Sequence, residues 1–154
     1  MSLKEIVEYG VIGILVFMSV IVLWASLERL LFYRQIELSS YKNKTQLEID
    51  LSKNLTLIAT IGSNAPYVGL LGTVFGIILT FVQLGQSGVV DTSSIMTGLA
   101  LALQATAGGL LVAIPSIIFY NLLMRKSEVL VAQWEILEKE GLLGDIQEDK
   151  NETL

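Results

Sequence analysis

The chain has 154 residues, of which 53% are hydrophobic and 16% are charged, and its mean hydropathy is +0.64. This composition is typical of a membrane protein. The formal net charge is −5, and the sequence contains neither cysteine nor histidine, which excludes disulfides, thiolate nucleophiles and imidazole acid–base or metal chemistry. We therefore expect no enzyme, no metal site and no cofactor, and no basic patch indicates binding to nucleic acid.

The first apolar segment runs from Tyr9 to Leu27 and comprises nineteen uncharged residues flanked by glutamates. About 20 apolar residues cross the roughly 30 Å of bilayer hydrocarbon, so this pattern predicts a transmembrane helix at 9–27 and an external N-terminus at 1–8. A cleaved signal peptide is the alternative. It is disfavoured because the run is longer than a usual signal-peptide core and because acidic neighbours offset Lys4.

A second apolar region, residues 54–124, contains one charged residue, Asp91, in the turn-like stretch GQSGVVDTSS. This pattern predicts two membrane-spanning helices, at 65–84 and 96–115, joined by an external hairpin at 85–95. The uncharged arms, 37 residues before the aspartate and 33 after it, would be helices of roughly 55 and 50 Å, which is longer than the bilayer requires. The excess is expected to project from the membrane as a helical stem.

Basic residues set the expected orientation, because short cytoplasmic loops are enriched in lysine and arginine. Five lie between the first and second spans, four follow the third span, and the external hairpin has none. This bias predicts an external N-terminus, with a loop and stem helix at 28–64 and a second stem helix at 116–141 in the cytoplasm. Gly141 is the expected stop of that second helix, and residues 142–154 are expected to be disordered.

Two amphipathic helices that face each other are predicted in the stem, because apolar residues recur there at helical spacing. The stripe before the second span comprises Leu47, Leu51, Leu55 and Ile58, and the stripe after the third comprises Leu130, Trp134 and Leu137.

Each helix of the hairpin gathers small and polar residues on one face. The first face comprises Gly69, Thr73, Gly76, Thr80 and Gln83, and the second comprises Ala102, Thr106, Gly109, Ala113 and Ser116. Such faces indicate close helix packing, in which hydroxyls bond across helices or to the carbonyl four residues earlier. Thr73 and Thr106 permit a second interpretation, because both fall near the middle of their spans, where a polar side chain is a candidate functional site.

The stretch APYVGLLGTVFGI, followed by ALQATAGGLLVAIPSIIFYN, resembles the paired signature of the MotA/TolQ/ExbB proton-channel family, and within it a short form of the ExbB branch. The resemblance implies an all-α inner-membrane protein with three transmembrane helices, the second and third long and extended into a cytoplasmic helical stem. Its N-terminus would be periplasmic, and it would form a homo-oligomer, a pentamer in this family.

Partners and function also follow from the resemblance. The family implies an ExbD-like single-span protein whose membrane aspartate takes up and releases protons, with TonB as a further partner and with membrane lipids that include bound phospholipid. The complex would energise TonB-dependent uptake through outer-membrane receptors. Two alternatives stay open, namely a TolQ-like role in the Tol-Pal envelope system and a passive scaffold that stabilises its partners.

By the same resemblance, Thr73 and Thr106 match the two threonines that the family places beside its proton path. Further candidates for lining the path are Thr80, Gly69, Gly76, Ala102, Gly109 and Ala113, whereas Gly72, Gly108 and Gln104 are expected to pack between helices. The family often has a glutamate where this chain has Leu101. The titrating acid is therefore expected to come from the partner, and whether Gln104 takes over part of its role is left open.

Overall fold

The computed structural model describes residues 3–87 and 91–152, and these are almost wholly helical. Three helices are long and apolar enough to cross a membrane, which confirms the predicted all-α membrane class. The elements in chain order are α1 (Leu3–Gln35), the 3-10 turn η1 (Leu38–Ser40), α2 (Lys44–Ser52), α3 (Leu55–Ser87) and α4 (Thr92–Glu152).

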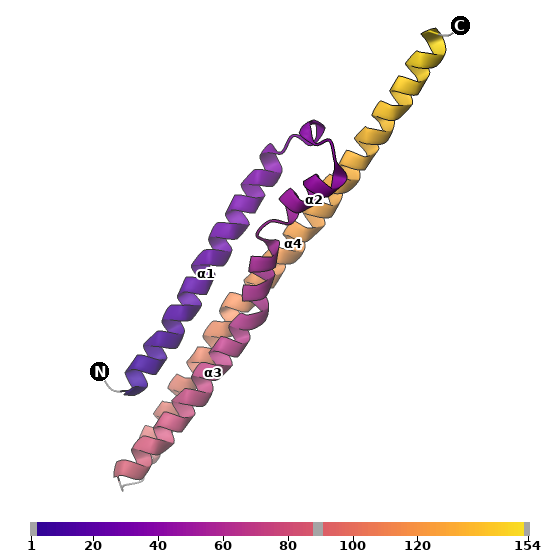
Figure 1. Cartoon of the computed structure of the whole chain (residues 1–154). Coiled ribbons are helices and arrows are strands. Elements are labelled where there is room, and N and C mark those ends of the chain that lie inside the picture. Colours follow the sequence, from indigo (N-terminus) through magenta and orange to yellow (C-terminus); the bar gives the residue numbers. More distant parts are fainter. Residues whose placement is uncertain (1–2, 88–90, 153–154) are drawn as a thin grey trace.

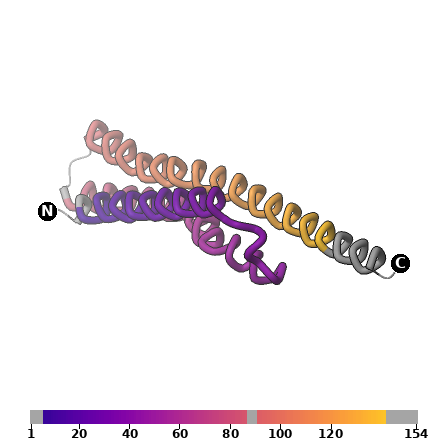
Figure 2. The backbone as a smooth tube through the Cα atoms, turned by 90° about the horizontal axis from the view of Figure 1, so that it is seen from above, coloured from indigo at the N-terminus to yellow at the C-terminus, as the bar shows by residue number. Residues whose placement is uncertain are grey.

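The helices α3 and α4 form an antiparallel hairpin, and α1 packs along it (Figure 1). The C-terminal half of α4 extends beyond the other helices, and α2 and η1 lie against its first part (Figure 1). The view from above shows the start of α1 at the same end of the molecule as the α3–α4 connection (Figure 2). The hairpin reaches further than α1 at that end, so the first turns of α1 lie against the sides of α3 and α4.

The helices are longer than the apolar segments that predicted them. α1 extends beyond 9–27 in both directions, and α3 and α4 extend beyond 65–84 and 96–115. The hairpin expected at 85–95 is correspondingly shorter, because α3 reaches Ser87 and α4 starts at Thr92, with residues 88–90 outside the described part of the chain.

Asp91 caps the start of α4. Its carboxylate accepts hydrogen bonds from the backbone N–H groups of Ser93 (3.1 Å) and Ser94 (3.2 Å) and from the Ser94 hydroxyl (2.6 Å). These bonds satisfy donors that have no partner inside the helix. The Ser94 hydroxyl contributes most to lowering the pKa of Asp91 below its usual value, and the two N–H groups add to it.

The stem before the second span is not one continuous helix. α2 ends at Ser52, α3 begins at Leu55, and between them Asn54 has a φ of 64°. Asparagine tolerates this left-handed conformation better than most residues, so it can end one helix and redirect the chain into the next. The predicted stripe of Leu47, Leu51, Leu55 and Ile58 is nevertheless buried throughout, with at most 2% of any of these residues exposed.

The C-terminal end of α2 is held by side chains of α1. The Arg29 guanidinium, which is 2% exposed, donates to the Asp50 carbonyl at 2.7 Å, and the Tyr33 hydroxyl donates to the Leu51 carbonyl at 2.6 Å. Carbonyls in the last turn of a helix have no donor within it, so α1 supplies the missing partners. Arg29 also pairs with Glu28.

The predicted stripe on the stem part of α4 is only partly correct. Trp134 is buried, and its indole N–H donates to the Tyr41 carbonyl at 3.0 Å, while Leu130 is half-buried beside it. Leu137 is 51% exposed, so its place in the stripe is wrong. The physical reason is that α2 begins at Lys44, whose amine already lies 2.5 Å from the carboxylate of Glu135, so α2 does not extend to cover the next turn of α4.

The stop expected at Gly141 is also wrong, because α4 continues to Glu152. The prediction of disorder beyond Gly141 is not tested, and residues 153–154 lie outside the described part of the chain. A glycine inside a helix costs only about 1 kcal/mol relative to alanine, and the leucine, glutamate, lysine and glutamine residues around it favour the helix.

Candidate functional site

Thr73 of α3 and Thr106 of α4 meet in the middle of the hairpin. Their hydroxyl oxygens lie 2.5 Å apart. The carbonyl oxygens of Ala102 (3.1 Å) and Gly69 (3.3 Å) also lie within hydrogen-bond distance of the Thr73 hydroxyl. Thr73 is buried, at 7% exposed, whereas Thr106 is half-buried. The two threonines that the sequence singled out thus form one hydroxyl pair within a single chain.

Glycines next to the pair bring the two backbones into contact. A Cβ atom added to Gly69 would lie 2.5 Å from the Ala105 carbonyl oxygen, and one added to Gly109 would lie 2.6 Å from the Ala65 carbonyl oxygen. Both distances are far inside van der Waals contact, and the obstructing atoms belong to the backbone, which cannot rotate away. The small residues at these two positions therefore set the separation of α3 and α4.

The contact continues toward the hairpin connection through Gly76 and Thr80. A Cβ atom at Gly76 would lie 2.8 Å from the methyl group of Ala102, and one at Gly98 would lie 2.6 Å from the Thr80 hydroxyl. The Thr80 hydroxyl donates to the Gly76 carbonyl of its own helix at 2.8 Å. Thr80 therefore shares the face of Thr73 but does not share its hydroxyl bond to α4.

All eight candidates for lining a path thus lie in or beside the α3–α4 contact. They are Gly69, Thr73, Gly76 and Thr80 on α3, and Ala102, Thr106, Gly109 and Ala113 on α4. Ser116, on the same face of α4, is 1% exposed, and its hydroxyl donates to the Val112 carbonyl at 2.6 Å. Gln83, the last residue of the predicted α3 face, is exposed, so the buried part of that face ends at Thr80.

Two of the three residues expected to pack between helices contact α1. A Cβ atom at Gly72 would lie 2.8 Å from a methyl group of Val11, and one at Gly108 would lie 3.3 Å from Leu15. These contacts fix the register of α1 against the hairpin. Gln104 is exposed, because it lies roughly 160° around α4 from Thr106, which faces α3.

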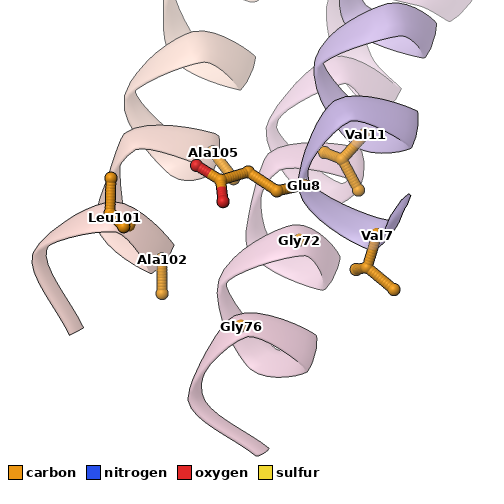
Figure 3. A pocket seen from close by; sticks show the side chains of 8 residues that line it. All are labelled: Val7, Glu8, Val11, Gly72, Gly76, Leu101, Ala102 and Ala105. Atoms are coloured by element: carbon orange, nitrogen blue, oxygen red, sulfur yellow. The ribbon is translucent and has the colours of Figure 1, made fainter. Parts of the chain in front are cut away.

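A cavity lies between the first turns of α1 and the α3–α4 hairpin. Figure 3 shows the Glu8 side chain extending from α1 toward α4 beside Ala105. The cavity is lined by Val7, Glu8 and Val11 of α1, Gly72 and Gly76 of α3, and Leu101, Ala102 and Ala105 of α4. The sequence prediction assigned Glu8 to the external N-terminus and missed this site, because periodicity alone does not give the register of α1 against the hairpin.

The chemistry of the pair follows from its functional groups. A hydroxyl both donates and accepts hydrogen bonds, so two hydroxyls can hold a carboxyl group in its protonated or its ionised form without adding a charge. The Thr73 hydroxyl can donate its one proton to the carbonyl of Ala102 or Gly69 and then accepts a hydrogen bond from the Thr106 hydroxyl. The arrangement is suited to hydrogen-bonding a group that carries a proton through the membrane.

Outside the apolar spans, Tyr41 takes part in two hydrogen bonds of the stem, because its carbonyl accepts from Trp134 and its hydroxyl donates to Asp50. The Tyr41 hydroxyl donates to a carboxylate oxygen of Asp50 at 2.9 Å. Burial raises the pKa of Tyr41, and the hydrogen bond to Asp50 raises it further. This bond ties the loop before α2 to the last turn of α2 and belongs to the scaffold of the stem.

The sequence is similar to those of known proteins. Residues 24–136 match the MotA/TolQ/ExbB proton channel family. A Helicobacter pylori protein named as an ExbB-like 2 biopolymer transport protein is 59% identical over 134 residues, which cover 87% of this chain and 89% of the relative. The biopolymer transport protein ExbB of Aquifex aeolicus is 53% identical over 139 residues, which cover 90% of this chain and 94% of the relative.

A more distant similarity reaches the Tol system. The Tol-Pal system protein TolQ of Pseudomonas aeruginosa is 42% identical over 87 residues, which cover 56% of this chain and 38% of TolQ. The family match spans most of the chain, from within α1 to the stem part of α4, and includes the threonine pair and the glycine contacts. Because the match is this extensive and the ExbB relatives are covered over nearly their whole length, the chain belongs to the MotA/TolQ/ExbB proton channel family, as a short-form member of ExbB type.

Proposed function

We propose that this chain is the channel-forming subunit of an inner-membrane complex that uses the proton motive force to energise TonB-dependent uptake through outer-membrane receptors. Membership of a proton-channel family and the biopolymer-transport names of its relatives support this role. Protons are the transported ions, and the chain acts without a cofactor and is not an enzyme. TonB and an ExbD-like single-span protein are its partners.

The observation that carries the proposal is the depth of the hydroxyl pair. Thr73 lies fourteen residues before the end of α3 at Ser87, and Thr106 lies fourteen residues after the start of α4 at Thr92. Both are therefore about 21 Å from the hairpin end of their helices, well inside a hydrocarbon layer of roughly 30 Å. A polar group at such a depth is costly when it is unpaired, which makes the pair a candidate for an ion pathway.

The proposed partner supplies the charge that the hairpin lacks. Between residues 54 and 124 the only charged residue is Asp91, at the connection. A single-span partner with a membrane aspartate would place its carboxyl group against the threonines, whose hydroxyls hydrogen-bond both of its protonation states. Copies of this chain would surround that partner as a homo-oligomer, a pentamer by analogy with the family.

The exposed surface of the chain is consistent with a position among lipids and other helices. Large apolar side chains are exposed along α1 and α4, for example Phe17 (66%), Trp24 (62%), Leu103 (61%) and Leu111 (75%). Exposed apolar area of this extent is stable only against lipid or against other helices. In the proposed orientation the N-terminus and the α3–α4 connection are periplasmic, and α2 and the C-terminal part of α4 form the cytoplasmic stem.

The test is deletion of the chain in its own bacterium, followed by growth on an iron chelate that requires an outer-membrane receptor. We expect growth on this iron source to be lost, to return with the wild-type chain, and to be abolished by a protonophore. Growth that is indifferent to the deletion would overturn the proposal.

A TolQ-like role is the second candidate, favoured by the 42% identity to TolQ. In that case the deletion would leave receptor-dependent growth intact and would weaken the envelope, measured as leakage of periplasmic protein. The two roles are thus separated by two measurements on one strain.

A further inference from the structure

One side of α4 stays uncovered from the middle of the hairpin into the stem. Six exposed residues follow it at intervals of 7, 7, 4, 7 and 7 positions, which keeps them within about 40° around a helix of 3.6 residues per turn. This side lies opposite Ala102 and Gly109, which face α3. We call it the outer face of α4, and it comprises Gln104, Leu111 (75% exposed), Ile118 (52%), Leu122 (64%), Val129 (39%) and Ile136 (56%).

In the membrane half of the outer face, the Gln104 amide has no partner within the described part of the chain. No hydrogen bond of its side chain occurs there, and the adjacent positions on α4, Ala100, Ala107 and Gly108, carry no polar side chain. Gln104 lies twelve residues after the start of α4, about 18 Å from the hairpin end. Hydrocarbon offers an amide neither a donor nor an acceptor, so the group needs a partner from another protein chain.

In the stem half of the outer face, lipid is absent as a cover. Beyond Arg125 the sequence of α4 carries charged residues every few positions, which places this part in water. Val129 and Ile136 are exposed there on the same side of the helix as Gln104. From Gln104 to Ile136 the outer face is about 48 Å long, whereas the hydrocarbon layer is roughly 30 Å thick. Its occupant must therefore continue from the membrane into the stem.

A second copy of this chain has the required length, because α3 and α2 together follow α4 from the hairpin end into the stem (Figure 1). The side of α3 that points away from α4 is also exposed, with Tyr67 (67%), Leu71 (52%) and Ile78 (50%). One α3 already covers one side of α4, so α3 of the next copy on the opposite side repeats the arrangement head to tail, which can close into a ring. A single-span partner of about 20 membrane residues would cover the membrane half alone.

We propose that α3 of a second copy packs along the outer face of α4, and that the Gln104 amide hydrogen-bonds this copy inside the membrane. The contact rests on the homo-oligomer of the proposed function and names the surfaces that join its copies. A polar side chain within an apolar contact between helices fixes their register, and this is the role of Gln104.

Disulfide crosslinking tests the contact directly, because the chain contains no cysteine. Tyr67 lies two residues before Gly69, and Leu111 lies two residues after Gly109, and these glycines meet across the hairpin. Tyr67 and Leu111 therefore share one level but point to opposite sides, so a disulfide between Tyr67→Cys and Leu111→Cys must join two copies, which share this level in a ring. Oxidation of inner membranes that contain the complete complex should give covalent dimers and larger ladders on denaturing gels.

The matched control pairs Tyr67→Cys with Phe17→Cys. Phe17 is 66% exposed on α1, two residues after Leu15, which contacts Gly108, so it lies near the level of Leu111 but outside the proposed contact. This pair should give no ladder. Absence of a ladder from the Leu111 pair, or an equal ladder from the control, would overturn the proposal.

Two substitutions test the same face without cysteines. Gln104→Leu would be neutral on a surface that faces lipid, but here it should weaken the association by about threefold per contact, seen as oligomer lost at a lower concentration of sodium dodecyl sulfate. Ile136→Asp should weaken it further, whereas Leu137→Asp, at the adjacent exposed residue on another side of α4, should not. Wild-type stability in Ile136→Asp would refute the outer face as the contact, and wild-type stability in Gln104→Leu would refute the amide bond.

Growth on the receptor-dependent iron source separates this proposal from the proposed function. A ladder from the Leu111 pair, in a bacterium whose growth is indifferent to deletion of the chain, would support the contact and refute the uptake role. A missing ladder, in a bacterium whose growth requires the chain, would refute the contact alone.

Discussion

The hydroxyl oxygens of Thr73 and Thr106 lie 2.5 Å apart across the α3–α4 contact, where glycines and alanines bring the two backbones close together. Thr73→Val and Thr106→Val keep the branched shape and remove only the hydroxyl. Assembly should survive, because a hydrogen bond inside a membrane protein contributes on average only about 0.6 kcal/mol. Receptor-dependent growth should be lost, with complex abundance followed on native gels.

Thr80→Val is the matched control for this pair. Thr80 is buried on the same face of α3, at 6% exposed, but its hydroxyl bonds the Gly76 carbonyl of its own helix. We expect normal growth from this variant. Equal growth defects at all three threonines, in proportion to lost complex, would instead support the passive scaffold.

The close approach at Gly69 makes a second prediction. In Gly69→Ala the new methyl group would lie 2.5 Å from the Ala105 carbonyl oxygen, so α3 and α4 must separate. Overpacking of this kind costs typically about 1–3 kcal/mol, and the thermal midpoint of the detergent-solubilised complex should fall.

Gly85→Ala is the control for Gly69→Ala, because no heavy atom lies within 4 Å of a Cβ atom at that position. It should leave the midpoint unchanged or raise it, since alanine favours a helix over glycine by about 1 kcal/mol. A Gly69→Ala complex as stable as the Gly85→Ala complex would refute the packing argument.

The orientation of the chain is the subject of a third prediction. The sequence contains no cysteine, so single cysteines can be introduced without a background. Gln86→Cys, near the α3–α4 connection, should react with an impermeant thiol reagent added outside spheroplasts, and Glu138→Cys, in the stem, should react only after lysis. Both positions are exposed, so burial cannot explain a lack of reaction. The reversed pattern would invert the proposed topology.

Much of the fold was predictable because the membrane imposes strong local rules. The run from Tyr9 to Leu27 and the arms around Asp91 identified three spans from apolar length alone, and the spacing of Leu47 and Ile58 identified the buried side of the stem. Helical periodicity also placed Thr73 on the small-residue face of α3 and Thr106 on that of α4, because the position of a residue around a helix depends only on spacing within that helix.

What could not be predicted depends on how separate helices meet. The cavity position of Glu8 follows from contacts of Val11 and Leu15 with glycines of the hairpin, and no periodic pattern gives that register. The break at Asn54 needed a single residue in the left-handed conformation. Arg29, the first basic residue after the span, proved to be buried, because the Asp50 carbonyl of α2 and the carboxylate of Glu28 accept its hydrogen bonds.

The start of α4 makes a fourth prediction, in which pH is varied. The pKa of Asp91 is lowered by its bond to the Ser94 hydroxyl and by two N–H groups, so its stabilising effect is present above the usual pKa of 3.8 and is lost as pH falls through the lower value of the folded state. Hydrogen exchange at the Ser93 and Ser94 amides should accelerate in that acidic range. In Asp91→Asn the amide oxygen accepts at every pH, so the acceleration should disappear. Identical acid behaviour in both proteins would show that another group controls the end of the helix.

The helix α4 runs without interruption for 61 residues, about 90 Å, through both the Thr106 contact and the stem. Thr106 divides it unequally, with fourteen residues back to Thr92 and forty-six onward to Glu152. Pivoted at that point, α4 would act as a lever whose stem arm, which contains Pro115, is about three times the length of the other. A displacement of a fraction of an ångström at the hairpin end would therefore be magnified at the end of the stem, so one helix links the Thr73–Thr106 contact to the far end of the molecule.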